Sequence, residues 1–97
     1  MTGNTFGARF AAAVRARGPL CVGIDAHPAL LHAWGVGDTV DGLRIFSETV
    51  IGALGDRVAV FKPQSAFYER FGSRGIAVLE SNIRQIRDAG ALALLDV

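Results

Sequence analysis

Three short apolar runs constrain the fold of this chain more than any other feature. They are LCVGI at 20–24, VAVF at 58–61 and ALALL at 91–95. None alternates strictly between apolar and polar residues, so the pattern predicts strands with no wet face, as in the centre of a parallel sheet. The runs recur at intervals of roughly 35 residues, which leaves room for a helix after each strand, because a βα unit of a large barrel takes about 30 residues.

The segments between these runs have the periodicity of amphipathic helices. Three apolar stripes have this periodicity. The first is Phe6, Phe10 and Ala13 or Val14, the second is Leu43, Phe46, Val50 and Ala53 or Leu54, and the third is Ile76, Leu79, Ile83 and Ile86. The predicted helix boundaries rest on residues typical of helix ends, with Asp38 or Thr39 and then Ser73 as N-caps, and Gly18-Pro19, Gly55 and Gly90 as stops.

The predicted order α-β-α-β-α-β favours right-handed βαβ units around a parallel sheet. Two architectures fit this order: an open doubly wound sheet, or the first three βα units of a (β/α)8 TIM barrel. A dinucleotide-binding open sheet usually has a glycine-rich turn after its first strand, whereas DAHPALL follows here. The barrel is therefore favoured, with residues 1–97 as the N-terminal part of one barrel domain. The apolar fraction of 51% is high for a free-standing domain of this length and indicates part of a larger core.

Charge and composition exclude several classes of partner. The formal net charge is +1 and the basic residues are spread along the chain, which predicts no nucleic-acid partner. No apolar run approaches the ~20 residues of a membrane span, so no membrane association is expected. The start MTGNTFGARF lacks the apolar core of a signal peptide, and the single Cys21 has no partner for an internal disulfide. A reducing cytoplasm is the expected location, with Cys21 as inert packing inside the first strand.

Each apolar run ends on a charged residue: Asp25, Lys62 and Asp96. In a parallel barrel the carboxyl ends of all strands meet at one rim, so these side chains should converge where barrel enzymes have their active sites. Asp25 alone is explained as readily by a turn or helix cap. Lys62 after an apolar strand needs a counter-charge or a ligand, and Asp96 can supply the counter-charge. Such a pair is either a structural ion pair or a preorganised electrostatic site.

Polar residues near these strand ends offer further contacts. Gln64 and Ser65, just beyond the second strand, could hydrogen-bond a ligand. His27 and His32 suggest a metal, but no third ligand accompanies them, so a loop or interface role is favoured and no metal is expected. The aromatic residues after Ser65 have near-helical spacing and indicate core or subunit contact.

Three stretches together resemble the orotidine 5′-phosphate decarboxylase family, in the branch found in mycobacteria and related bacteria. They are LCVGIDAHPALLHAWG, VAVFKPQSAFYERFGSRGIAVLE and the final ALALLDV. The resemblance covers essentially the whole chain, and KPQSAFYERFGSRG is its most specific part. Ala26 stands where the family pattern leads us to expect proline.

The resemblance implies a dimeric (β/α)8 barrel that uses no cofactor and no metal. Such an enzyme removes CO2 from orotidine 5′-phosphate to give UMP in pyrimidine biosynthesis. Carried over by position, Asp25 resembles the acid that binds the ribose, and Lys62 the lysine of the charged network. Asp96 resembles the first acid of the family's D-x-K-x-x-D motif, which lies against the substrate carboxylate.

The departure from the family lies at the end of the chain. The proton-donor lysine would stand two residues after Asp96 and the second acid five residues after, but the sequence ends at Val97. We therefore expect a chain truncated after the third strand and inactive by itself. Two alternatives stay open: a related phosphate-binding barrel enzyme, such as a Mg²⁺-dependent sugar-phosphate decarboxylase or synthase, and a non-catalytic α/β fragment or interaction module.

Overall fold

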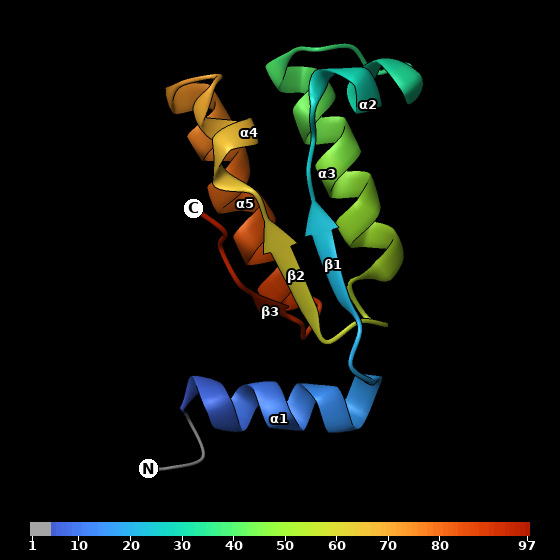
Figure 1. Cartoon of the computed structure of the whole chain (residues 1–97), viewed down its shortest axis with the longest axis vertical. Helices are drawn as coiled ribbons and strands as arrows, with labels where there is room; N and C mark the ends of the chain where they lie inside the picture. The colour runs from blue at the N-terminus through green and yellow to red at the C-terminus, as the bar shows by residue number, and fades with distance from the viewer. Residues whose placement is uncertain (1–4) are drawn as a thin grey trace.

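A computed structural model describes residues 5–97 and has a parallel three-stranded sheet in the order β1-β2-β3 (Figure 1). The elements in chain order are α1 (Phe6–Arg17), β1 (Cys21–Ile24), α2 (Pro28–Ala33), α3 (Val40–Leu54), β2 (Val60–Pro63), α4 (Ser65–Glu69), α5 (Ser73–Asp88) and β3 (Leu92–Ala93). The predicted alternation is confirmed, with two short helices, α2 and α4, that the sequence pattern did not predict. No helix among residues 5–97 is both long and apolar enough to span a bilayer.

The bounds of the second and third strands differ from the apolar runs that predicted them. Cys21 pairs with Val60 and Val60 with Leu92, so the three strands start in step. The second strand was predicted two residues too early, because Val58 and Ala59 are buried before strand pairing begins. Lys62 consequently lies inside β2 rather than after it. The third strand is shorter than predicted, although an isolated parallel bridge joins Gln64 to Asp96 beyond it.

Helices α3 and α5 pack against each other and against one face of the sheet, while α1 crosses the amino-terminal end of the strands (Figure 1). The core between them is apolar and includes Ile24, Leu43, Phe46, Ile51, Phe61, Leu79 and Ile86. Burying each large apolar side chain of this kind contributes roughly 1.5–3 kcal/mol before the entropy of ordering is subtracted. This layer therefore fixes where the strand ends lie.

The opposite face of the sheet is largely open, which corrects the expectation that neither face would be wet. Cys21, Gly23 and Lys62, which share this face by alternation and register, are all exposed. Leu94 continues the same face at 46% exposure. Cys21 is thus an exposed strand residue rather than inert packing. An apolar run in the sequence predicts a strand that is buried on both faces, but residues 5–97 cover only one face of this sheet.

Helix ends follow local chemistry. Thr39 caps α3 by accepting a hydrogen bond from the Gly42 amide at 3.0 Å, so Thr39 and not Asp38 is the N-cap. The predicted cap Ser73 is wrong: Gly72 is the N-cap of α5, and Ser73 is the first helical residue. Gly90 follows α5 at φ 88°, a backbone conformation that strongly favours glycine.

Arg17, in the last turn of α1, ties three chain segments together. Its guanidinium donates to the carbonyl oxygens of Gly55 at 2.6 Å, Val58 at 3.2 Å and Ala89 at 2.8 Å. Gly55 and Ala89 are the C-caps of α3 and α5, where carbonyls have no partner within the helix. A cation at these helix ends is also favoured by the helix dipoles.

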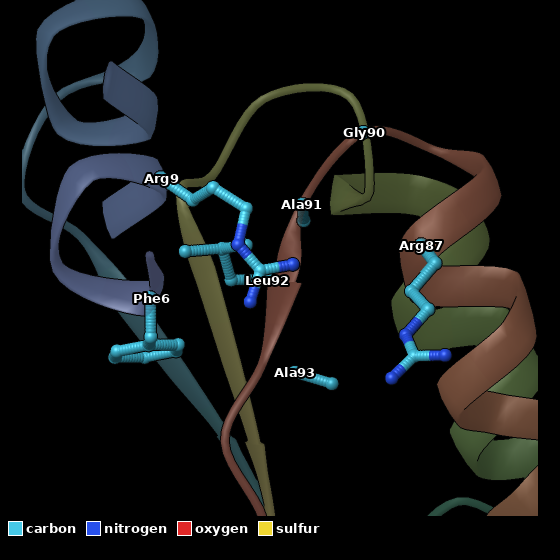
Figure 2. A pocket seen from close by; sticks show the side chains of 7 residues that line it. All are labelled: Phe6, Arg9, Arg87, Gly90, Ala91, Leu92 and Ala93. Atoms are coloured by element: carbon cyan, nitrogen blue, oxygen red, sulfur yellow. The ribbon is translucent and has the colours of Figure 1, made fainter. Parts of the chain in front are cut away.

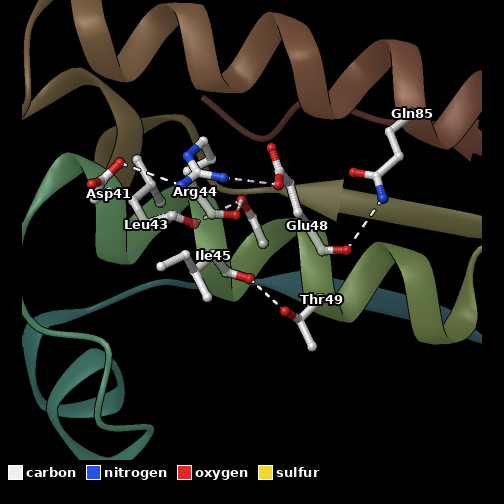
Figure 3. Close-up of polar contacts among 8 residues, drawn as sticks. Asp41, Leu43, Arg44, Ile45, Glu48, Thr49 and Gln85 are labelled. Atoms are coloured by element: carbon white, nitrogen blue, oxygen red, sulfur yellow. Dashed lines mark hydrogen bonds and ion pairs between the residues drawn. The ribbon is translucent and has the colours of Figure 1, made fainter.

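The outer surface of α3 carries polar contacts that stabilise the helix locally (Figure 3). Arg44 forms ion pairs with Glu48 at 3.2 Å and Asp41 at 3.5 Å. Both pairs are exposed and have helical spacing, so each contributes only a few tenths of a kcal/mol, about 0.2–0.5. Gln85 of α5 donates to the Glu48 carbonyl at 3.2 Å and joins the two helices.

Candidate active site

The three predicted charged residues lie on one face at one end of the sheet. Alternation along each strand places Asp25 with Gly23, and Asp96 with Leu94, on the open face that Lys62 occupies. Asp25 and Asp96 come after their strands and Lys62 is the last residue but one of β2, so all three lie near the carboxyl edge, where a (β/α)8 barrel has its active site. The structure therefore gives these residues the shared rim that the sequence predicted.

Lys62 and Asp96 form the central ion pair of this rim. The distance from Lys62 Nζ to Asp96 Oδ2 is 3.8 Å, with the side chains 46% and 40% exposed. At this exposure the pair contributes roughly 0–1 kcal/mol to stability. This contribution to stability is too small to explain why the two residues are paired here. Both charged groups remain accessible to a ligand on the open face.

Main-chain bonds hold the two residues in place. The Asp96 amide donates to the Pro63 carbonyl at 3.0 Å, and the Ser65 amide donates to the Asp96 carbonyl at 2.8 Å. The Gln64 amide donates to the Ile24 carbonyl at 3.2 Å, joining the end of β1 to the end of β2. The pair is thus fixed by backbone pairing on both sides of Lys62, which is the kind of rigid support that electrostatic preorganisation requires.

Asp25 stands at this rim without an ion pair. Its side chain lies on the open face, since its two carboxylate oxygens are 3.8 and 3.9 Å from where a Cβ on Gly23 would be. Within residues 5–97 no ion pair of 4.0 Å or less joins Asp25 to a basic group. Asp25 is exposed and available as a hydrogen-bond acceptor.

The two predicted polar contacts differ in availability. Gln64 is half-buried and precedes α4 as its N-cap residue, without a side-chain capping bond. Ser65 is 6% exposed, and its hydroxyl donates to Glu69 at 2.7 Å. Gln64 is therefore free to turn toward the rim, whereas Ser65 can only accept from a ligand, because its hydroxyl hydrogen is already donated to Glu69.

His27 has a structural role, and His32 is an exposed residue in the last turn of α2. His27 is the N-cap of α2, with Nδ1 accepting from the Leu30 amide at 3.2 Å, and Pro28 occupies the first helical position, which suits proline. Among residues 5–97 no three His, Cys, Asp or Glu side chains come close enough to hold a metal ion. The loop role predicted for His27 is specifically that of a helix cap.

A second polar contact at the same end of the sheet was missed. Arg70, at the end of α4, pairs with Asp38 in the loop before α3 and lies over the Phe71 ring at 4.2 Å. The hydrogen bond from Arg70 lowers the pKa of the Asp38 carboxyl below its usual range. The sequence offered no signal for it, because the pairing joins two loops that are 32 residues apart.

A buried polar pair lies beneath this end of the sheet. The Asn82 side-chain amide donates to the Tyr68 hydroxyl at 2.8 Å, and both residues are fully buried. Burial raises the pKa of Tyr68 to about 12. Tyr68 thus confirms the core role predicted for the aromatic residues, while its hydroxyl is satisfied inside the protein.

Three parallel strands, with α3 and α5 on one face and charged side chains gathered at the strand ends, put this chain in the α/β class and fit one part of a (β/α)8 barrel. No family model matches the sequence. The curated proteins that it matches include orotidine 5′-phosphate decarboxylases. The chain is 70% identical over 94 residues to the one from Salinispora arenicola, which covers 97% of this chain and 34% of that protein. It is 62% identical over 91 residues to the one from Streptomyces coelicolor, covering 94% and 33% respectively.

A solved structure extends the comparison to three dimensions. The crystal structure of a Streptomyces avermitilis protein, assigned as an orotidine 5′-phosphate decarboxylase, superposes with a TM-score of 0.93 at 62% identity. The match covers 95% of this chain and 32% of that one. The chain thus has the fold of about a third of a barrel, and it spans about a third of the length of the curated relatives that it matches.

Proposed function

We propose that these residues supply the first three βα units of an orotidine 5′-phosphate decarboxylase, which converts orotidine 5′-phosphate to UMP and CO2. The observation that carries the proposal is the Lys62–Asp96 pair at 3.8 Å on the barrel rim of a chain 70% identical to such a decarboxylase. The resemblance further supports a cytoplasmic homodimer that acts without a cofactor or metal. Residues 1–97 then form one part of a single barrel domain.

The chemistry of decarboxylation explains why this rim needs alternating charges. Loss of CO2 breaks the bond to the ring and leaves its electron pair on a ring carbon, where a fixed ammonium nearby stabilises the negative charge. A proton must then add to this carbon to give UMP, and the resemblance assigns its delivery to the lysine that would stand two residues after Asp96. Asp96 holds the Lys62 ammonium in position before the reaction begins, so no reorganisation is needed when the charge develops. In this proposal Asp25 hydrogen-bonds the ribose, as the resemblance implies, and Gln64 and Ser65 offer further hydrogen bonds to the ligand.

A chimeric enzyme tests the proposal directly. Residues of this chain replace the matching 94-residue segment of the Salinispora arenicola decarboxylase, and UMP formation from orotidine 5′-phosphate is measured. We expect an active chimera that a metal chelator does not inhibit. A folded but inactive chimera would refute the assignment, and inhibition by the chelator would favour a metal-dependent barrel enzyme instead.

Charge variants of the chimera assign the site. Lys62→Ala and Asp96→Ala should each lower kcat at least about 100-fold, the effect of removing one preorganised electrostatic group. Asp56→Asn is the matched control, because the Asp56 side chain is 80% exposed and lies in the loop before β2, away from the rim. Turnover by Lys62→Ala equal to that of Asp56→Asn would remove Lys62 from the mechanism.

The 97-residue chain alone should show no turnover. Its open sheet face leaves the Lys62–Asp96 pair in water, where a charge interaction is far weaker than in a closed site. Measurable UMP formation by the purified chain would show that three βα units suffice.

A further inference from the structure

The chain leaves β1 and β2 at the rim in two segments, which we call the first rim segment (residues 25–39) and the second rim segment (residues 64–72). The first contains α2 and ends at the N-cap of α3, and the second contains α4 and ends at the N-cap of α5. Asp25 and Gln64, two of the candidate ligand-binding residues, belong to these segments. The way in which the segments are held relative to each other therefore affects the ligand site.

The two rim segments and the contact between them lie entirely within residues 5–97. Strands β1 and β2 pair directly, from Cys21 with Val60 to Ile24 with Pro63, so no further strand can come between these two units. A hollow of about 240 Å³ between α1 and the end of α5 differs in this respect (Figure 2). It lies along the outer edge of β3, which a closed barrel pairs with another strand, so it carries no ligand site.

One ion pair joins the two rim segments at their far ends. The Arg70 guanidinium donates to the Asp38 carboxylate, and it also lies 4.2 Å from the centroid of the Phe71 ring. Among the described residues no backbone hydrogen bond connects residues 34–39 with the second rim segment. The Asp38–Arg70 pair is therefore the polar contact that holds this part of the first rim segment to α4.

The second rim segment is the better anchored of the two. The Tyr68 hydroxyl accepts from the buried Asn82 amide of α5 at 2.8 Å, and the Ser65 amide donates to the Asp96 carbonyl at 2.8 Å. By contrast, the backbone hydrogen bonds of residues 34–39 lead only to the first rim segment itself and to the start of α3. Arg70 thus reaches from an anchored helix to a loop with fewer restraints.

The Asp38–Arg70 pair restrains this loop without being needed for folding. With the side chains 36% and 30% exposed, such an ion pair adds little to global stability. Its effect falls on the loop instead, because a contact that orders a loop before a ligand arrives reduces the entropy that is lost on binding. The hydrogen bond from Arg70 lowers the pKa of the Asp38 carboxyl, so the ion pair persists at neutral pH.

We propose that Asp38 and Arg70 are positioning residues that hold the two rim segments together as one preformed wall of the ligand site. This inference rests on the proposed decarboxylase function and adds two residues to it. The Lys62–Asp96 pair is held separately by main-chain bonds and does not depend on this contact. Loss of the Asp38–Arg70 pair therefore weakens the binding of orotidine 5′-phosphate and leaves the chemical step unchanged.

Kinetics of the chimeric decarboxylase test this separation of binding from chemistry. Asp38→Asn and Arg70→Gln should each raise KM about fivefold, a factor that corresponds to roughly 1 kcal/mol, and change kcat by less than about twofold. The double variant should have the KM of either single variant, since each substitution removes the same contact. The dissociation constant of UMP, measured by calorimetry, should rise by the same factor.

Arg44→Gln in the chimera is the matched control. Arg44 also forms a partly exposed ion pair, with Glu48, but both residues lie on α3, so the pair joins no second segment. This variant should leave KM and kcat unchanged. Arg70→Lys keeps the charge without the planar fork and should raise KM less than Arg70→Gln. Melting temperatures within about 4 °C of the unsubstituted chimera show that each variant is folded.

Three results would overturn the inference. The first is a KM for Arg70→Gln equal to that for Arg44→Gln, and the second is a lowered kcat with KM unchanged. The third is additive effects of Asp38→Asn and Arg70→Gln, which would show that the two residues act separately. Each of these results is obtained with an active chimera and leaves the proposed function intact, whereas a chimera that forms no UMP would overturn both proposals.

Discussion

Arg17 offers a stability prediction whose magnitude follows from its three hydrogen bonds. Hydrogen bonds to a charged group contribute about 1.5–3 kcal/mol each when buried, but Arg17 is half-buried and water can reach the freed carbonyls. We therefore expect Arg17→Ala to lower the free energy of unfolding by about 2–4 kcal/mol in total. A small domain is stable by only about 5–15 kcal/mol, so this loss is large.

The measurement is urea unfolding of the chain followed by circular dichroism. Arg15→Ala is the matched control, since Arg15 lies in the same last turn of α1 and is exposed. It should change stability by less than about 0.5 kcal/mol. Arg17→Lys should retain part of the effect, because a single ammonium keeps the charge without the planar fork that reaches all three carbonyls. If Arg17→Ala and Arg15→Ala unfold at the same urea concentration, the three bonds do not stabilise the fold.

A double-mutant cycle with Gly90 tests the same contact from its other side. A Cβ at position 90 would lie 2.5 Å from the Arg17 Nη2 atom, and the φ of 88° adds backbone strain. Gly90→Ala should therefore be destabilising, and less so when Arg17 is already alanine, because the clash is then gone. Purely additive effects would show that Arg17 does not occupy this position in solution.

Two further predictions concern the glycines of α3 and the only tyrosine. Gly42→Ala would place a Cβ 1.9 Å from the Gly37 carbonyl oxygen and should unfold the chain or lower its stability by several kcal/mol, whereas Gly52→Ala, with only a side-chain atom 3.8 Å away, should stabilise α3 by up to about 1 kcal/mol. Thermal unfolding of the two variants checks this, and equal midpoints would contradict it. The folded Tyr68 has a pKa of about 12 against about 10 when unfolded, so between these values the folded state binds more protons and stability falls as pH rises, by about 2–3 kcal/mol. Since Tyr68 is the sole tyrosine, phenolate absorbance reports it directly, and a midpoint near pH 10 in the folded chain would refute the burial argument.

The periodic parts of this fold were predictable from the sequence, and the short parts were not. Three long helices follow from apolar periodicity and three strands from short unbroken apolar runs, whereas α2 and α4 have six and five residues, too few for their spacing to predict a helix. The second strand was misplaced because burial begins at Val58, two residues before the strand itself begins. Burial and strand pairing are separate properties of a residue, and hydropathy predicts only burial.

The same distinction applies to the candidate site. Lys62 and Asp96 were paired correctly because strand ends converge in any parallel sheet, whatever the loops do. The Asp38–Arg70 pair joins two loops, so its geometry depends on chain paths that no periodicity describes. The roles of Asp25, Gln64 and Ser65 toward a substrate stay predictions that the chimeric enzyme can test.

The bonds that align the strand ends have an evolutionary consequence. They run between main-chain atoms, from the Gln64 amide to Ile24, from the Asp96 amide to Pro63 and from the Ser65 amide back to Asp96. None of these bonds requires a particular side chain at the rim. A substitution there therefore changes the chemical group of the side chain without moving the backbone position that carries it. Proteins that inherit this scaffold can therefore change their reaction by single substitutions at the rim, because the main-chain bonds already fix the positions of the substituted residues.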